Sequence, residues 1–339
     1  MTAIPATATA AKAVRDWRRL LQPYRSPRLA RSVFELAVTL VPFVLLWSAA
    51  FLALEVGYWL TLLLVVPAAM FLVRLFLIQH DCGHNAFFRS RAVNDWLGRT
   101  LGVLTMTPYG VWKHSHAMHH ATAGNLDQRG IGDIKTLTVA EYRALSPLMR
   151  LKYRLYRHPV IMFALGPTAL FLLLHRVPLG QMRRGWRPWA SAMGTNVAIA
   201  AVATGMMTLT GIQAFLLVHL PIVAVAASMG VWLFYVQHQF EETHWSAPPQ
   251  WSHDEAALHG SSHYDLPGGL KWLTAYIGVH HVHHLASRIP FYRLPEVLRD
   301  FPELLDVRRI TVAESLACVR LKLWDTERQR LVTFVEAQV

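Results

Sequence analysis

The sequence contains few cysteines. Its 339 residues include only Cys82 and Cys318, which form neither a CxxC pair nor the spacing of a zinc ribbon. This excludes a disulfide scaffold and an iron–sulfur cluster held by cysteines. A short apolar core with a small-residue cleavage site is also missing from the first thirty residues, which are Ala-rich and then basic. We therefore expect no cleaved signal peptide.

Charged residues are scarce as well. They make up 16% of the chain, against about a quarter in a typical soluble protein, whereas hydrophobic residues make up 53%. This balance indicates a membrane protein. The net charge is nevertheless +12, which in a membrane protein marks the cytoplasmic face and its contact with anionic lipid head groups. No nucleic-acid-binding module accompanies the charge, so we expect no nucleic acid partner.

Long uncharged runs predict four membrane-spanning helices arranged as two hairpins. At about 1.5 Å per residue, each run is long enough to cross a hydrocarbon core of about 30 Å. The expected spans are Leu36–Leu54, Val56–Val73, Ala190–Leu209 and Gln213–Gln237. We expect the second helix to continue past the membrane through Arg74 into the segment HDCGH, and the second hairpin to turn at Thr210–Gly211.

The distribution of cations predicts the orientation of these helices. The turns at 55–59 and 210–212 carry no Lys or Arg, whereas the segments before both hairpins are rich in Arg. The positive-inside rule therefore places both termini and the central region in the cytoplasm. Two further apolar stretches, Val93–Tyr109 and Pro159–Leu174, are expected to be interfacial or re-entrant pieces over the cytoplasmic end of the bundle. From Leu294 on, the sequence predicts short amphipathic helices.

Histidine, by contrast, is abundant, with 18 residues. Eight of them fall in three clusters at helical spacing: His80 and His84 in HDCGH; His116, His119 and His120 in HSHAMHH; and His280, His283 and His284 in HHVHH. Side chains three and four positions apart share a helix face, so each cluster can direct its imidazoles toward one point. Imidazole binds zinc, copper, iron and nickel. Eight imidazoles exceed the needs of one ion, so two metal ions on the cytoplasmic side are the economical interpretation.

Other interpretations of the histidines are weaker. A single pair at i, i+4 is usually a solvated helix face, but three clusters on one side of a predicted membrane do not arise readily by chance. A metal transporter would hold its site near the bilayer midplane on broken helices. The predicted spans carry almost no ionisable residues in their central turns, which disfavours transport.

The order, spacing and placement of the three clusters resemble the histidine boxes of the membrane fatty acid desaturase family, over roughly residues 36 to 305. The segments GNLDQRGIGD and HHVHHLASRIPFYRLPE are similar to the bacterial acyl-lipid desaturases, including omega-6 types. The resemblance implies that the eight histidines bind two irons that activate molecular oxygen. It also implies one further ligand shortly after the last span, and His238 in VQHQFEETHW stands there.

The remaining histidines and four carboxylates have lesser expected roles. His114 and His281 lie inside the boxes but off the spacing, so we expect neither to be a ligand. Four aspartates near the clusters could accept hydrogen bonds from ligand imidazoles and fix their tautomers, although capping of loops explains them equally well. They are Asp81, Asp127, Asp133 and Asp265.

The reaction implied by the resemblance is oxygen-dependent desaturation of the acyl chain of a membrane lipid. A di-iron hydroxylase of alkyl or lipid substrates, which has the same boxes, is the alternative. The chain has no GxGxxG loop and no haem-attachment motif, so electrons must come from a separate donor, by family analogy a ferredoxin or a b-type cytochrome.

The predicted architecture is an all-α integral membrane protein with two transmembrane hairpins, interfacial helices and a cytoplasmic helical cap that carries the histidine boxes. We expect a basic cytoplasmic segment over residues 1–32, the desaturase domain over 33–305 and a cytoplasmic helical tail over 306–339. The resemblance to bacterial enzymes implies the bacterial inner membrane.

Overall fold

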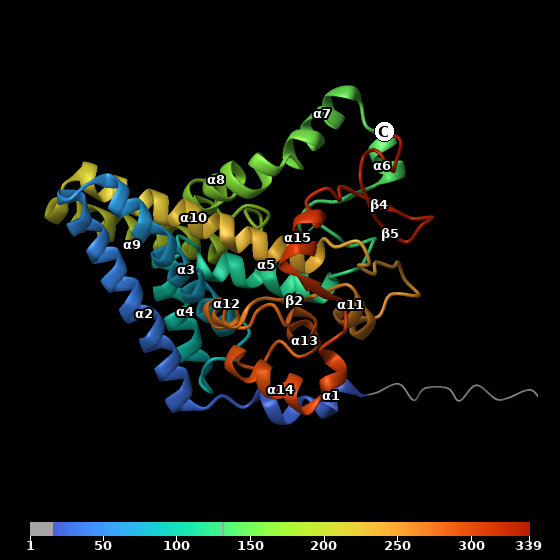
Figure 1. The fold of residues 1–339 in the computed structure, drawn as a ribbon, viewed down its shortest axis with the longest axis horizontal. Coiled ribbons are helices and arrows are strands. Elements are labelled where there is room, and N and C mark those ends of the chain that lie inside the picture. Colours follow the sequence, from blue (N-terminus) through green and yellow to red (C-terminus); the bar gives the residue numbers. More distant parts are fainter. Residues whose placement is uncertain (1–15, 131) are drawn as a thin grey trace, which may run out of the picture.

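The computed structural model describes residues 16–130 and 132–339. Residues 1–15 of the predicted basic segment 1–32 lie outside the described residues. The described chain is mainly helical, with long helices on one side and a compact cap of short elements on the other (Figure 1). This confirms the predicted fold class.

In the described part of the chain, four helices are long and apolar enough to cross a membrane. They are α2 (Leu29–Leu52), α3 (Tyr58–Gly83), α9 (Trp186–Thr210) and α10 (Ile212–His238). They form the two predicted hairpins. The second turns at Gly211, whose φ of +84° lies in the left-handed region that favours glycine.

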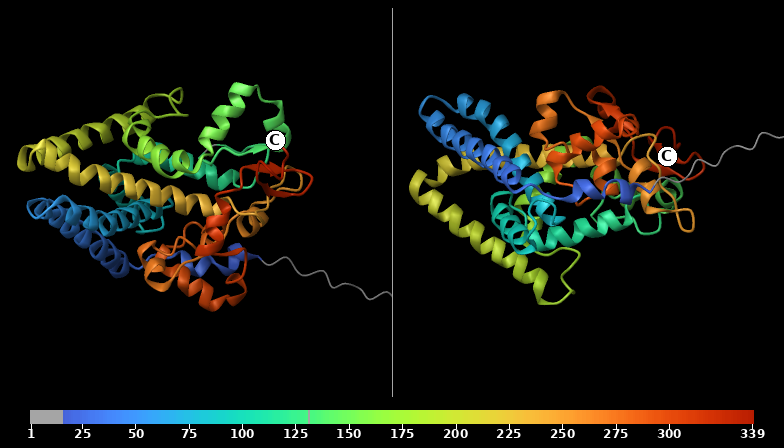
Figure 2. Two further views of the ribbon diagram at one scale, coloured as in Figure 1. Left: turned by 45° about the horizontal axis from the view of Figure 1, so that its top comes forward. Right: turned by 90° about the horizontal axis from the view of Figure 1, so that it is seen from below.

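Helix α3 continues without a break from the membrane to the first histidine cluster, as predicted. It packs against α2, α4 and α10, and its apolar window is the most buried of the four. Helices α3 and α10 therefore form the centre of the bundle, and both end at the same side. Two further views show the cap seated on that end of the hairpins (Figure 2).

Short helices connect the two hairpins. They are α4 (Arg91–Leu104), α5 (Tyr109–Thr122), α6 (Val139–Ala144), α7 (Pro147–Tyr156) and α8 (Gly166–Leu172), with a π-helical turn at Ile161–Leu165 before α8. The stretch Val93–Tyr109 forms most of α4 and the start of α5. The α4 helix is too short to span a membrane, as expected.

Helix α7 and the segment 161–176 form a pair bent by 59°, which by composition alone could be a fifth, broken span. Contacts at its two ends indicate otherwise. At one end the guanidinium of Arg157 donates to Thr136 Oγ1 and Leu321 O, and at the other Arg176 donates to Met106 O. Both ends thus contact segments on the cap side of the bundle, which supports the expected re-entrant or interfacial placement.

The cap combines short helices with short strands. The helices are α1 (Trp17–Leu20), α11 (His253–His259), α12 (Gly268–Leu273), α13 (His280–Leu285), α14 (Leu294–Asp300) and α15 (Val312–Cys318). The strands are β1 (Leu137–Thr138), β2 (His263–Asp265), β3 (Arg309–Thr311), β4 (Leu323–Asp325) and β5 (Arg330–Val332). Strand β1 pairs in parallel with β4, which pairs antiparallel with β5; β2 and β3 form a separate parallel pair.

The short helices expected after Leu294 are present as α14 and α15, but the strands β3, β4 and β5 were not expected. Strands of three residues are too short to show a period of two in the sequence. Their stability comes from distant partners, since β4 pairs with Leu137–Thr138 and the buried ring of Trp324 stacks on Trp245 with centroids 5.1 Å apart.

Candidate metal centre

Four helices bring the predicted ligands together. His80 lies in the last turn of α3 and His84 directly follows it, while His238 is the last residue of α10. The second cluster lies along α5 and the third forms α13. The centre thus lies where two membrane-spanning helices end beneath the cap.

Within the described residues, the nine histidines form two groups, and the ligand atoms of each group all lie within 4.8 Å of one another. The first group is His80, His84, His116, His120 and His283; the second is His119, His238, His280 and His284. The structure therefore brings together every histidine predicted to be a ligand, and it adds a division into five and four that the sequence did not show.

The doublets His119–His120 and His283–His284 explain this division. Consecutive residues of a helix point about 100° apart, so the two members of a doublet face different groups. Helix α5 places His116 and His120 in the first group and His119 in the second, and α13 places His280 and His284 in the second group and His283 in the first. Each helix thus contributes to both groups and holds them side by side.

The spacing of the nitrogen atoms fits metal ions. Ligands at right angles around an ion bound at about 2.1 Å lie about 3.0 Å apart. In the first group the Nε2–Nε2 distances are 2.9 Å for His116–His84, 3.1 Å for His120–His116 and 3.1 Å for His283–His120. In the second group they are 3.1 Å for His119–His238, 2.9 Å for His280–His238 and 3.1 Å for His284–His280. Nitrogens that converge in this way present donor sets suited to two ions.

Six of the nine imidazoles are also in the protonation state that metal binding requires. Burial, reinforced by neighbouring histidines, lowers the pKa well below the ordinary 6.5 for His84, His116, His120, His280, His283 and His284. These side chains are therefore neutral at pH 7, and each has a nitrogen lone pair available to a metal.

Aromatic side chains pack against both groups. The indole of Trp112 stacks on His116 with centroids 4.7 Å apart, and the ring of Phe234 lies 5.2 Å from His119 and 5.3 Å from His238. A cavity of about 30 Å³, room for about one or two water molecules, adjoins His119 and His238. Each group of the candidate centre therefore has an aromatic ring packed against it, and a small cavity adjoins the second group.

Of the four aspartates considered from the sequence, Asp133 contacts a ligand most closely, since its Oδ1 accepts from Nδ1 of His119. Burial raises the pKa of Asp133, but the attraction and hydrogen bond of His119 bring it below the ordinary value. Asp81 Oδ1 lies 3.7 Å from Nδ1 of His80, too far for a hydrogen bond, and its other oxygen accepts from Phe291 N at 2.8 Å.

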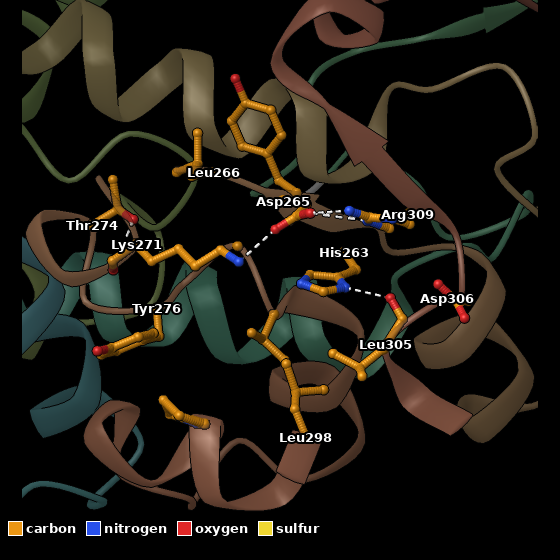
Figure 3. Close-up of a pocket in the computed structure, with 14 residues that line it drawn as sticks. His263, Asp265, Leu266, Lys271, Thr274, Tyr276, Leu298, Leu305, Asp306 and Arg309 are labelled. Carbon is orange, nitrogen blue, oxygen red and sulfur yellow. Dashed lines mark hydrogen bonds and ion pairs between the residues drawn. The ribbon is translucent and has the colours of Figure 1, made fainter. Parts of the chain in front are cut away.

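The other two aspartates lie away from the imidazoles. Asp127 is exposed on the loop after α5. Asp265 lines a cavity of about 470 Å³ between α12, α14, β2 and β3, where it pairs with Lys271 at 2.6 Å and with Arg309 at 2.9 Å (Figure 3). Of the two interpretations left open for these aspartates, support of a ligand imidazole is therefore wrong for Asp265, which ends strand β2 and pairs with two cations, and the exposed position of Asp127 gives it no support.

His114 and His281 lie outside both groups, as expected. His114 contacts Arg184 at the surface of α5. His281 is fully buried, with its Nε2 2.9 Å from Leu304 O and its ring 5.7 Å from that of His263. The aromatic walls formed by Trp112 and Phe234 were missed in the sequence, because large apolar residues at helical spacing look like ordinary core.

The chain is similar to known proteins over most of its length. The fatty acid desaturase family model matches residues 57–314. A fatty acid desaturase of Bacillus subtilis (strain 168) is 47% identical over 311 residues, covering 92% of this chain and 88% of the relative. Two proteins of Synechocystis sp. are 28% identical and cover 65% of this chain: an sn-1 oleoyl-lipid 12-desaturase and an sn-1 acyl-lipid omega-3 desaturase (ferredoxin). The chain spans 62% and 61% of their lengths.

The matched region contains all three histidine clusters and His238, and therefore every residue of the two groups. The chain belongs to the fatty acid desaturase family and is a membrane desaturase.

Proposed function

We propose that this enzyme introduces a double bond into the acyl chain of a membrane lipid, using two irons, molecular oxygen and electrons from a separate protein. The observation that carries the proposal is the pair of imidazole groups at the cap-side end of four apolar helices. In this position the centre faces the lipid chains on one side and a soluble donor on the other.

The nine histidines of the two groups would hold the irons. When bound, a reduced iron pair with oxygen supplies the oxidant that an unactivated methylene requires and that no side chain provides. The protein's own contribution is to hold the neutral imidazoles at fixed spacing and to keep water away. The rings of Trp112 and Phe234, which pack on His116 and His119, serve both purposes and offer an apolar surface to an acyl chain.

The substrate class rests on the relatives. The two Synechocystis enzymes are named for acyl chains of lipids, one of them an oleoyl chain. An acyl lipid also suits a centre built at the membrane surface, because the substrate can approach without leaving the bilayer.

An external electron donor is required because the sequence has no motif for a redox cofactor of its own. One relative is named with ferredoxin, which favours a ferredoxin over a b-type cytochrome. The excess of Lys and Arg, concentrated on segments placed in the cytoplasm, would attract an acidic donor. The same excess supports an inner-membrane location with the metal centre and both termini in the cytoplasm.

Analysis of lipids from a bacterial host tests the proposal. Cells that express the protein with a compatible ferredoxin and its reductase should gain phospholipids with one additional double bond. The variant His120→Ala should give no such product, because it removes an imidazole from the five-histidine group. An unchanged double-bond profile together with a new hydroxylated lipid would overturn desaturation in favour of the hydroxylase alternative.

A further inference from the structure

The outward-facing nitrogens of the nine imidazoles differ in their partners. In each group the Nε2 atoms converge, so Nδ1 is free to bond to the surrounding protein. Among the nine candidate ligands, all within the described residues, His119 is the one whose Nδ1 hydrogen-bonds to a carboxylate. The carboxylate belongs to Asp133. His238 Nδ1 lies 3.4 Å from Gly260 O, and the Nδ1 atoms of His80, His120 and His280 are buried without a hydrogen-bond partner.

The loop after α5 is built to deliver this carboxylate. Gly132 has a φ of +74°, and a Cβ atom there would lie 2.7 Å from Ser115 O and 3.2 Å from Cβ of His119. Only glycine allows the backbone to lie this close to α5, and Asp133 follows directly. Its second oxygen accepts from Gly130 N at 3.4 Å.

Arg129, a cation of the same loop, does not compete for Asp133. Arg129 donates to Glu141, to Leu126 O and to Thr136 O, which leaves the carboxylate of Asp133 to His119. The carboxylate is largely buried, with 19% of the side chain exposed. A hydrogen bond to an anion in such surroundings is stronger than one to a neutral group.

We propose that Asp133 is a positioning residue that holds His119 in the tautomer with Nε2 free and strengthens it as a ligand, which makes the four-histidine site unlike the five-histidine site. A carboxylate on the outer nitrogen fixes the ring and raises the basicity of the inner one. The site that has fewer imidazoles thereby gains the more basic donor. This inference rests on the proposed function only in requiring that the two groups bind metal.

Metal binding by purified protein tests the proposal directly. The variants are Asp133→Ala and Asp133→Asn, and the control is Asp127→Ala, which removes an exposed carboxylate from the same loop. Titration with Co²⁺, followed by visible absorption and by metal content, separates the two sites without any assay of activity. Asp133→Ala should weaken one site about 10- to 100-fold and leave the other unchanged. Asp133→Asn, which keeps an acceptor oxygen, should weaken the same site less, and Asp127→Ala should match the wild type.

A double-mutant cycle distinguishes positioning of His119 from a general role in folding. If Asp133 acts through His119, then Asp133→Ala adds no further loss of metal affinity in the His119→Ala background. An equal loss in both backgrounds would overturn the inference. The inference would also be overturned if the wild type binds two Co²⁺ ions and the Asp133→Ala variant binds two with the same affinity and spectrum. Failure of the wild type to bind metal would overturn the proposed function as well.

Discussion

His281 shows how a histidine inside a ligand-rich segment can have a purely structural role. Its ring is fully buried, contacts the carbonyl of Leu304 and lies beside His263, so it joins α13 to the segment that follows α14. His114, in the second cluster, contacts Arg184 at the surface instead. Neither residue fits the ligand spacing, but we expect their removal to lower the stability of the protein by different amounts.

We expect His281→Ala to destabilise the protein by about 2–3 kcal/mol, because it removes a hydrogen bond and leaves a cavity. His114→Ala should change stability by less than about 0.5 kcal/mol. Melting temperatures in detergent measure both. Metal content per folded chain should stay at the wild-type level in each, and a loss in His281→Ala as large as in His280→Ala would contradict the structural role.

The identity of the candidate ligands could be predicted from the sequence, because i, i+3 and i, i+4 spacing is a local property of a helix. His238 was predicted from the family resemblance, which implies a further ligand after the last span. The division into five and four could not be predicted, since it depends on how α3, α5, α10 and α13 are rotated against one another. For the same reason, the sequence could not select Asp133 from four similar aspartates.

At the scale of elements, a buried ion pair joins the first hairpin to the cap. Arg74 of α3 and Glu35 of α2 are fully buried and hydrogen-bonded to each other. The guanidinium also donates to Thr39 Oγ1 at 3.0 Å and lies 4.1 Å from the ring centroid of Trp272 in α12. The pair therefore fixes the relative positions of α2, α3 and the cap at the membrane boundary.

Removal of Glu35 would leave the buried guanidinium of Arg74 without its counter-charge. We expect Glu35→Ala to destabilise the protein by about 3–5 kcal/mol. Arg31 also pairs with Glu35, at 2.7 Å, but its side chain is half exposed, so Arg31→Ala should cost less than about 1 kcal/mol. Thermal unfolding in detergent compares the two, and equal losses would show that the buried pair contributes nothing beyond a surface contact.

The existence of the four long helices was predictable because a membrane helix needs a long uncharged run, although α2 begins at Leu29, ahead of the predicted Leu36. The pairing of Arg74 with Glu35 could not be predicted, since it depends on the register of the hairpin. The strands of the cap were missed because the partners lie far apart in the chain: β1 is in the central region and β4 is near the C-terminus. Three-residue segments contain too little pattern to predict such a pairing.

At the scale of the whole molecule, the proposed topology places only the two hairpin turns outside the cytoplasm. Cysteines introduced at Val56 and Ile212, both exposed, should react with an impermeant thiol reagent added to intact spheroplasts. Ile212 is preferred to Gly211, whose positive φ would strain a cysteine. The native Cys82 and Cys318 are buried and should give little background.

Cysteines at Met182 and Arg288 should react only after the membrane is opened. Met182 lies in the segment between the bent pair and α9, where Gln181 donates to Val111 O and Ser115 Oγ of α5. Labelling of Met182→Cys from outside would mean that the bent pair crosses the membrane, and the proposed orientation would be wrong.

The central claim is that nine histidines hold two metal ions, and metal content measured by elemental analysis tests it most directly. Protein purified after expression with iron should contain about two irons per chain. His120→Ala and His284→Ala, which each remove a ligand from a different group, should each lower the content toward one, while His114→Ala keeps two. Full iron content in both His120→Ala and His284→Ala would contradict the account.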